Sequence, residues 1–287
     1  MTRPLPKFLA AMATAAMLAI LAGCGSTTTS SSTNSVAAAD CTPDKMQTHT
    51  AGELTVATDK PAYPPYFLNN DPANGKGFES ATAYAIANRL GYAPSDVNWV
   101  TEPFNSSYAP GPKDFDFDVN QISITPARAQ HVDFSAPYYT ANQAVVAAKG
   151  SSAASAKTLA DLKDATIGVQ LGTTSLDAVN TQIQPSTQPK VFNDSNDVVT
   201  ALKENQVDAI VTDLPTALYI TAVQVPDGTV VGQFSAPGGD QWGALLAKGS
   251  PLTPCVSLAI DELRSSGELQ RIETRWMSQA ASAPTLK

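Results

Sequence analysis

The chain has 287 residues, of which 43% are apolar and 15% are charged, with two histidines and three cysteines. That length accommodates one large domain or two of ordinary size, with a core that needs no covalent staples. The net charge is −8 and there is no basic block, which argues against nucleic-acid binding. The histidines and cysteines stand far apart, so we expect no structural zinc cluster, and no motif calls for another cofactor.

The first 23 residues have the organisation of a secretory signal peptide. Arg3 and Lys7 precede an apolar stretch from Phe8 to Ala22, which is shorter than the ~18–20 residues that a membrane-spanning helix needs. The stretch ends in the sequence LAGC at Cys24, which resembles the lipobox of bacterial lipoproteins, where the cysteine carries the lipid. The alternative is an ordinary signal peptide followed by a chance cysteine. Residues 24–40 are rich in Ser and Thr, which predicts a flexible linker between the lipid and the folded domain.

The other two cysteines, Cys41 and Cys255, stand near the two ends of the remaining chain. An exported protein folds in an oxidising compartment, where disulfides form and persist. With Cys24 assigned to the lipid, a bridge between Cys41 and Cys255 is favoured over two free buried thiols. These features together predict an extracytoplasmic protein that is anchored by lipid to the cell membrane.

Strand and helix patterns alternate along the rest of the chain. Short apolar runs of strand type cover residues 53–58, 97–101, 165–170 and 208–212. Apolar residues at helical spacing cover residues 79–90, 198–202 and 258–276. This alternation is typical of an α/β fold with mostly parallel sheets flanked by helices. The Pro-, Gly- and Asp-rich stretch 103–118 and the stretch 149–157 are predicted to be loops.

Arg128 is the first candidate for a binding residue. Thr125 is a suitable N-cap and Pro126 a suitable first helical residue, which would place Arg128 in the first turn of a helix. A cation is disfavoured there by ~0.3–1 kcal/mol, so an anionic partner is expected nearby. Free N–H groups and a guanidinium can bind a carboxylate. Pairing of Arg128 with a surface acid such as Asp133 is an equally good explanation.

Two further candidates follow predicted strands. Residues 172–175 (GTTS) could bind an anion through free N–H groups, although simple N-capping explains the pattern better. The segment lacks the Gly-Lys-Ser/Thr ending of a P-loop, which argues against nucleotide binding. Asp213 ends another strand, at the edge of the sheet where α/β proteins form ligand clefts. It could receive an ammonium group or could merely cap a helix.

Six segments, in this order, resemble family 3 of the bacterial extracellular solute-binding proteins, the polar amino-acid receptors of ABC importers. They lie between about residues 50 and 280 and read LTVATD…YPPY, GFE…AIANRLGY, SITPARAQHVDFSAPYY, IGVQLGTTS, ALKENQVDAIVTD and GELQRIETRWM. The resemblance implies a two-lobed clamp, the type II periplasmic-binding-protein fold. Lobe 1 would comprise residues 41–141 and 242–287, and lobe 2 residues 142–241.

The resemblance also implies ligand contacts at eight positions. These are Arg128 and the backbones of Ser123 and Thr174 for the α-carboxylate, Asp213 for the α-ammonium, Tyr63 and Phe104 for an aromatic sandwich, and Asp59 and Gln170 for the ligand side chain. The chain departs from the family at Glu79, where Asp is usual, and at Asn120 and Gln121, where smaller residues are usual. Because Gln170 is not basic, an acidic ligand is disfavoured, and the implied ligand is a polar or basic amino acid.

The resemblance therefore predicts a monomeric receptor that binds an amino acid and delivers it to an ABC permease in the membrane, without catalysis. One alternative is an enzyme on the same fold, such as a dehydratase or a peptidoglycan lyase, for which Glu79 and Glu102 are the remaining acids to test. The sequence contains no G-x-S-x-G motif and no histidine suited to a catalytic triad. A second alternative is a ligand sensor without transport.

Overall fold

Two separate β-sheets of five strands each organise the computed structural model of the chain, which describes residues 37–236, 238–277 and 283–287. The predicted signal peptide, Cys24 and the linker up to residue 36 lie outside the described residues. Ala38–Asp40 form a short 3-10 turn, which lies within the stretch 24–40 that was predicted to be a flexible linker. Val36–Lys287 group as one compact unit. Among the helices of the described residues, none is long and apolar enough to cross a membrane.

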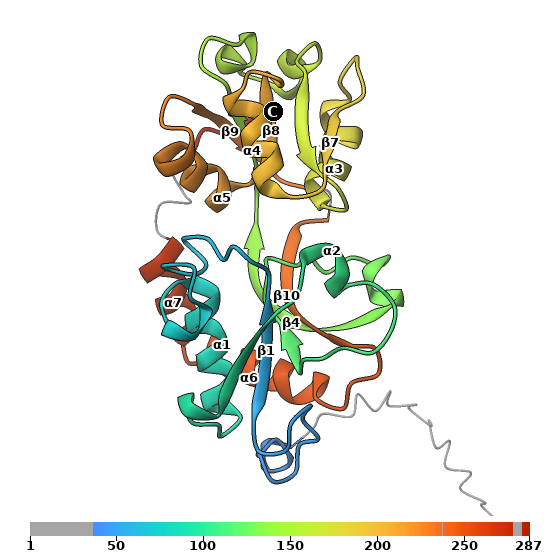
Figure 1. Cartoon of the computed structure of the whole chain (residues 1–287), viewed down its shortest axis with the longest axis vertical. Coiled ribbons are helices and arrows are strands. Elements are labelled where there is room, and N and C mark those ends of the chain that lie inside the picture. The colour runs from blue at the N-terminus through green and yellow to red at the C-terminus, as the bar shows by residue number, and fades with distance from the viewer. Residues whose placement is uncertain (1–36, 237, 278–282) are drawn as a thin grey trace, which may run out of the picture. The chain divides into compact units, whose positions relative to one another are not determined.

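The first sheet carries the start of the folded chain (Figure 1). Its strands, in spatial order, are β2 (Val97–Thr101), β1 (Leu54–Thr58), β3 (Phe117–Asp118), β10 (Asp240–Ala247) and β4 (Val132–Ala141). Strand β1 is buried at all five positions because successive side chains enter two different cores. Leu54 and Val56 pack in the larger core, and Ala57 packs in a smaller core on the opposite face.

Helices cover the larger core of the first sheet. They are α1 (Phe78–Arg89), α6 (Thr253–Ser265) and α7 (Glu268–Met277). Helix α1 places Ala83, Ile86 and Ala87 in that core, as the helical spacing predicts. Gly91 follows it with φ +86°, which is the left-handed conformation common after a helix end. The short helix α2 (Phe104–Ser107) contributes Phe104 to the opposite, smaller core.

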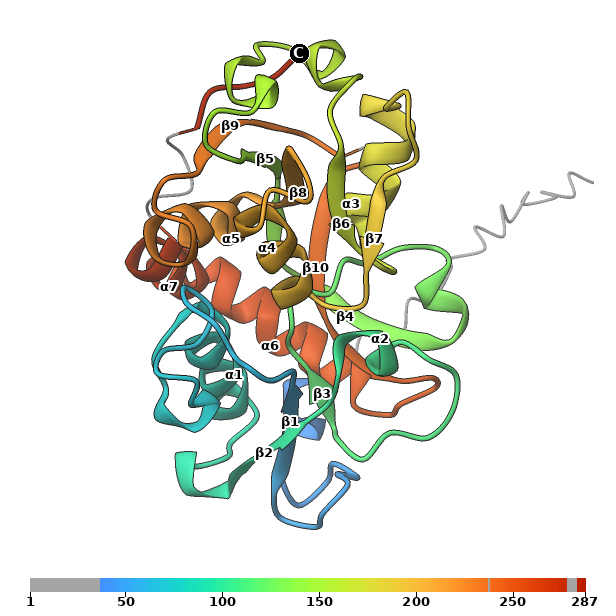
Figure 2. The ribbon, with the colours of Figure 1, turned by 45° about the horizontal axis from the view of Figure 1, so that its top comes forward.

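The second sheet carries the middle of the chain. Its strands, in spatial order, are β7 (Lys190–Phe192), β6 (Ile167–Gln170), β8 (Ala209–Asp213), β5 (Gln143–Ala147) and β9 (Thr229–Phe234). Its helices are α3 (Thr174–Ala178), α4 (Ser195–Lys203) and α5 (Leu214–Tyr219). Alternate residues of β5 again enter two cores, one with residues of α3 and one with residues of α4 and α5. Figure 2 shows these elements from a second direction. This sheet is therefore buried on both faces, as its apolar strands predict.

The sheets are mixed, with one strand in each running against the other four. Strands β1, β2 and β3 are parallel, whereas β10 is antiparallel to β3 and β4. In the second sheet β5 is the reversed strand, antiparallel to β8 and β9. Strand β4 leads into β5 through Asn142 alone, and β9 leads into β10 through residues 235–239. The chain reaches β5 and β10 directly from a strand of the other sheet, without a crossover helix. These two strands can therefore run antiparallel to their neighbours.

Three local expectations need correction. The stretch 103–118, predicted to be a loop, contains helix α2 and strand β3, and the stretch 149–157 contains a 3-10 turn at Ser152–Ser155. Residues 283–287 were expected with lobe 1 but lie against the second sheet, where Thr285 pairs with Gln233 of β9. Leu286 is buried in that core because Gly232 leaves room for it. A Cβ at Gly232 would lie 2.7 Å from Leu286 Cγ.

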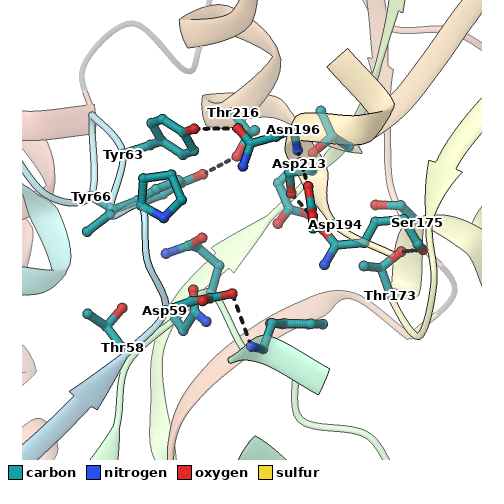
Figure 3. Close-up of a pocket in the computed structure, with 18 of the residues that line it drawn as sticks. Thr58, Asp59, Tyr63, Tyr66, Thr173, Ser175, Asp194, Asn196, Asp213 and Thr216 are labelled. Carbon is teal, nitrogen blue, oxygen red and sulfur yellow. Dashed lines mark hydrogen bonds between the residues drawn. The ribbon is translucent and has the colours of Figure 1, made fainter. Parts of the chain in front are cut away.

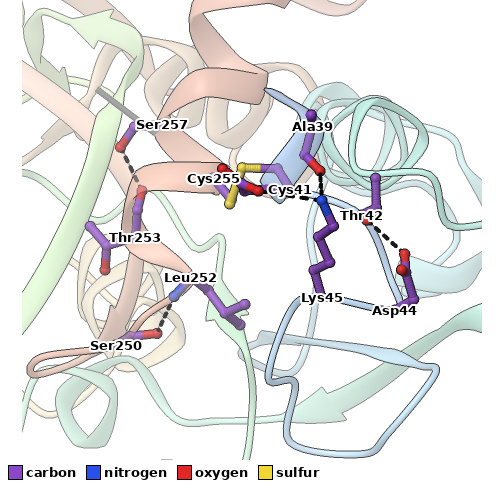
Figure 4. The surroundings of a disulfide bond; sticks show 11 residues. Ala39, Cys41, Thr42, Asp44, Lys45, Ser250, Leu252, Thr253, Cys255 and Ser257 are labelled. Atoms are coloured by element: carbon purple, nitrogen blue, oxygen red, sulfur yellow. Dashed lines mark hydrogen bonds and ion pairs between the residues drawn. A yellow bond between two sulfur atoms is a disulfide. The ribbon is translucent and has the colours of Figure 1, made fainter. Parts of the chain in front are cut away.

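A disulfide joins Cys41 to Cys255, with 5.4 Å between the two Cα atoms (Figure 4). Cys41 precedes the first strand, and Cys255 lies in the first turn of α6. Both residues are buried in the larger core of the first sheet. The bridge closes a loop with a sequence separation of 214 residues, which encloses nearly the whole folded chain.

Candidate functional site

A cleft of about 330 Å³ lies at the carboxyl ends of β1, β6 and β8 (Figure 3). Its walls come from both sheets and their loops. All eight positions singled out by the family resemblance line it: Asp59, Tyr63, Phe104, Ser123, Arg128, Gln170, Thr174 and Asp213. A cleft of this size and position is where α/β proteins bind small ligands.

The Arg128 guanidinium is fixed in the wall of the cleft. Its Nη1 donates to the carbonyl of Ser123 at 2.8 Å and its Nη2 to the carbonyl of Gly172 at 2.9 Å. Its Cζ lies 4.7 Å from the ring centre of Tyr108 and 5.3 Å from that of Phe104. Burial lowers the pKa of Arg128, but a guanidinium remains protonated in proteins. The group is thus a preorganised cation with N–H donors to spare.

Neither explanation offered for Arg128 from the sequence describes its surroundings fully. The expected helix is only a 3-10 turn, Arg128–Gln130, which is too short for a helix dipole to matter. Thr125 still supports the turn, since its hydroxyl accepts from the Arg128 N–H at 3.2 Å. The suggested partner Asp133 pairs instead with Lys248 at 3.1 Å. Among the described residues no carboxylate forms an ion pair with Arg128, so this buried cation lacks a counter-anion.

Asp213 lies on another part of the cleft wall and, in contrast to Arg128, needs a positively charged partner. Gln143 donates one amide group to both Asp213 (2.8 Å) and Asp240 (2.6 Å), which brings the two carboxylates close together. Burial raises the pKa of Asp213 well above its ordinary value, and the nearby Asp240 raises it further. Asp213 is the N-cap residue of α5, but its side chain makes no capping hydrogen bond, so the capping alternative is wrong. The pair of acids favours a cation in front of it.

The turn before α3 joins the two sides of the cleft. Thr173 is the N-cap, accepting from the Leu176 N–H at 3.2 Å, as the capping interpretation predicts. Thr174 is the first helical residue, and its hydroxyl lies 3.3 Å from that of Ser123. Gly172 has φ +73°, and a Cβ there would lie 2.3 Å from the Tyr108 hydroxyl. Glycine therefore permits the close approach that brings its carbonyl to Arg128.

The aromatic positions line the cleft at different places. The Tyr63 ring centre lies 5.8 Å from that of Tyr219, and the Tyr63 hydroxyl donates to Asn196. Phe104 lies against Tyr108, with ring centres 5.6 Å apart, and under Arg128. Each ring is therefore held by neighbours before any ligand arrives.

Asp59 and Gln170 provide polar groups that are already partly engaged. The Asp59 carboxylate accepts from the Lys60 N–H at 2.7 Å and from the Phe104 N–H at 3.1 Å. The Gln170 side-chain oxygen accepts from the Ser195 hydroxyl at 2.6 Å. The carboxylate keeps lone pairs, and the amide keeps its NH₂ group, for a further partner.

Several lining residues were not foreseen from the sequence. They are Tyr66 and Thr216, whose hydroxyls lie 2.8 Å apart, and the segment 193–196 (NDSN) after β7. The position of this segment in the cleft was predictable, because the segment follows a strand at the same sheet edge as Gln170 and Asp213. Asn120 and Gln121, noted only as departures from the family, also line the cleft.

The comparisons with known proteins agree with this geometry. Residues 54–279 match the family model for bacterial extracellular solute-binding proteins, family 3. The arginine-binding extracellular protein ArtP of Bacillus subtilis is 31% identical over 208 residues, or 70% of this chain and 78% of ArtP. The L-cystine-binding protein TcyJ of Escherichia coli is 28% identical over 219 residues, or 75% of this chain and 79% of TcyJ.

A solved structure is similar as well. An ancestral arginine-binding protein bound to glutamine has 33% sequence identity and a TM-score of 0.67, with 79% of this chain and 99% of that chain covered. The family match spans both sheets and every cleft residue described above. The chain therefore belongs to family 3 of the bacterial extracellular solute-binding proteins.

Proposed function

We propose that the protein is a receptor that binds a polar or basic L-amino acid in the cleft and delivers it to an ABC importer. The observation that carries this proposal is a complementary pair of unmet charges. Arg128 is a buried cation without a counter-anion among the described residues, and in the same part of the chain no cation forms an ion pair with Asp213, which is one of two neighbouring acids. An amino acid brings a carboxylate and an ammonium together and can satisfy both.

The contacts suggest how each backbone group of the ligand is held. The α-carboxylate accepts from the unused N–H donors of Arg128 and from the N–H of Thr174, at the start of α3. The α-ammonium donates to Asp213. A ligand that lacks either charge leaves its partner buried and unpaired, which gives the site its specificity for zwitterions.

The side-chain half of the cleft is polar, with Asp59, Gln170, Asn120 and Gln121 among its lining residues. The names of the relatives point the same way, since they bind arginine or L-cystine and the solved neighbour holds glutamine. We therefore take the ligand to be a polar or basic amino acid.

Binding without catalysis is favoured over an enzyme on the same fold. Neither Glu79 nor Glu102, the acids that remained for catalysis, is among the residues that line the cleft. A general acid or base must reach the proton that it transfers. Turnover of prephenate or arogenate by the purified protein would reverse this choice.

Location and motion of the protein follow from the same proposal. The protein is exported, lipid-anchored through Cys24 and monomeric, with lobes built largely on the two sheets. Contacts such as that of Arg128 with Gly172 and that of Tyr66 with Thr216 join the two walls of the cleft. Ligand contacts made to both walls favour a closed state, which is the form that a permease could recognise. A receptor that signals instead of feeding a permease would use the same clamp.

A thermal-unfolding screen against the common L-amino acids tests the binding proposal. A ligand at a hundredfold excess over its Kd stabilises the folded state by about 2.7 kcal/mol. For a chain of this size the Tm then rises by about 5–10 °C. We expect such a rise with one or a few polar or basic amino acids and none with acidic ones.

Asp213→Asn is the informative variant for the same screen. It replaces the carboxylate that would face the α-ammonium by a neutral amide, so the Tm rise should largely disappear. The raised pKa of Asp213 means that its ionised form is disfavoured in the folded state, so the ligand-free variant should be as stable as the wild type or more so at pH 7. Asp227→Asn, at an exposed position before β9, is the control and should bind normally. Full binding by Asp213→Asn would contradict the assignment.

A further inference from the structure

Gln121 adopts a backbone conformation that its residue type disfavours. Its φ is +50°, in the left-handed region that glycine adopts freely and other residues adopt at a cost. One carboxylate compensates, because Glu79 accepts from both nitrogens of this residue. The backbone N–H of Gln121 donates to Glu79 Oε1 at 2.7 Å, and its side-chain Nε2 donates to Oε2. Gln121 is one of the residues that line the cleft, and its side chain is fixed at the amide end by Glu79.

Glu79 is itself held in the core. It is the second residue of α1 and is 0% exposed. The chain just before it is tightly packed, since a Cβ at Gly77 would lie 2.3 Å from the Tyr66 carbonyl oxygen. The Tyr138 hydroxyl donates to Glu79 Oε1 at 2.5 Å. No lysine, arginine or histidine pairs with Glu79 in the part of the chain that the structure describes, so three hydrogen bonds carry its charge.

Several titratable groups face Glu79 from the elements packed around it. Tyr138 comes from β4, Tyr66 from the segment before α1, Asp118 from β3 and Asp213 from the end of β8. Burial raises the pKa of Glu79 to about 7, opposed by the hydrogen bonds from Tyr138 and Gln121. Glu79 can therefore gain or lose a proton near neutral pH.

We propose that Gln121 determines ligand specificity in the cleft and that Glu79 is the positioning residue that decides which end of its amide the ligand meets. An ionised carboxylate only accepts hydrogen bonds, so it holds the NH₂ end of the amide and leaves the carbonyl oxygen for the ligand. When Glu79 takes up a proton from solvent, its O–H donates, and the amide turns to bring its carbonyl to Glu79. The NH₂ end is then offered to the ligand.

The inference rests on the proposed function and refines the ligand class. With Glu79 ionised, the cleft favours side chains that only donate, such as guanidinium and ammonium groups. With Glu79 protonated, it favours side chains with an acceptor, such as an amide carbonyl. The relative affinity for cationic and amide amino acids thus depends on pH, although neither ligand side chain titrates between pH 5.5 and 8.5.

The test measures the Kd values of L-arginine and L-glutamine by calorimetry between pH 5.5 and 8.5. Their ratio is the informative quantity, because titration of Asp213 acts on the α-ammonium of both ligands and cancels. The preference for arginine should rise about tenfold with pH in the wild type, with a midpoint near 7, since an acceptor replaces a donor in front of the side chain.

Four variants test whether Glu79 orients the Gln121 amide or only supports the fold. Glu79→Gln mimics the protonated acid and should show the low-pH ratio at every pH. Gln121→Gly suits the positive φ and should fold but lose the pH dependence of the ratio. Tyr138→Phe removes a hydrogen bond that lowers the pKa of Glu79, so the midpoint should move to higher pH. Glu102→Gln, which alters an acid outside the cleft lining, should behave as the wild type.

The two proposals fail in distinguishable ways. Arginine and glutamine binding with a pH-independent ratio in the wild type would overturn the role of Gln121 and leave the receptor function standing. Absence of binding by all amino acids would overturn the receptor function. In that case NMR of the ligand-free protein decides the inference: the side-chain amide signals of Gln121 should move with the carboxyl signal of Glu79, and independent titration would overturn it.

Discussion

Replacement of Arg128 by alanine should lower the affinity for the amino acid by at least about a hundredfold while the protein remains folded. The guanidinium is buried, lies in the cleft wall and has no ionic partner among the described residues. Hydrogen bonds to charged groups contribute about 1.5–3 kcal/mol each, so loss of a bidentate contact to a carboxylate costs about 3 kcal/mol or more. Titration calorimetry with the ligand found in the thermal screen measures the loss.

Two further variants show whether the loss of affinity comes from the guanidinium itself. Arg128→Lys keeps a positive charge but loses the planar fork, so it should recover only part of the affinity. Thr125→Val removes the hydroxyl that supports the turn but leaves the guanidinium, so its effect should be small. Wild-type affinity in Arg128→Ala would contradict the proposed carboxylate site, whatever the other two variants showed.

Removal of the Cys41–Cys255 disulfide should cause the largest loss of stability, with little effect on ligand affinity. A crosslink stabilises the folded state chiefly by restricting the unfolded chain, and typical effects are about 2–4 kcal/mol, more for long loops. This loop encloses nearly the whole folded chain. The double variant Cys41→Ala/Cys255→Ala should therefore unfold about 10 °C lower than the oxidised wild type.

Thermal unfolding with and without reducing agent gives the control. Reduction should lower the Tm of the wild type towards that of the double variant and should leave the double variant unchanged. Neither cysteine is among the residues that line the cleft, so Kd values measured well below the Tm should agree between the two proteins. Equal Tm values for oxidised and reduced wild type would show that the bridge does not contribute to stability.

The elements with a strong local pattern were predictable from the sequence. The strand β2 has the predicted bounds, and α1 begins and ends within one residue of the predicted helix. These segments combine apolar periodicity with a terminating signal such as Gly91. The clearest failure is the turn at Arg128, where an N-cap threonine and a following proline were taken to open a helix. No apolar stripe follows them that would pack a longer helix.

The residues of the cleft were predictable where they stand at strand ends or in family motifs, and not elsewhere. Tyr66 and Thr216 meet across a sequence separation of 150 residues, which no local pattern reveals. Asp116 is another case, since it lies in the stretch 103–118 that was predicted to be a loop. It is buried, and its carboxylate accepts from the backbone N–H groups of His49 and Thr55. The sequence alone does not distinguish a buried aspartate that binds a distant loop from an aspartate exposed to solvent.

The pairing of the last residues with β9 places the two ends of the folded chain beside different sheets. The amino-terminal end is bridged at Cys41 to helix α6 beside the first sheet, whereas Leu286 is buried beside the second. Dyes attached near residue 40 and at Lys287 would therefore report the proposed closure of the cleft as a change in energy transfer, with no label inside the cleft. A bulky fusion at the carboxyl terminus would be attached beside the second sheet and not beside the first.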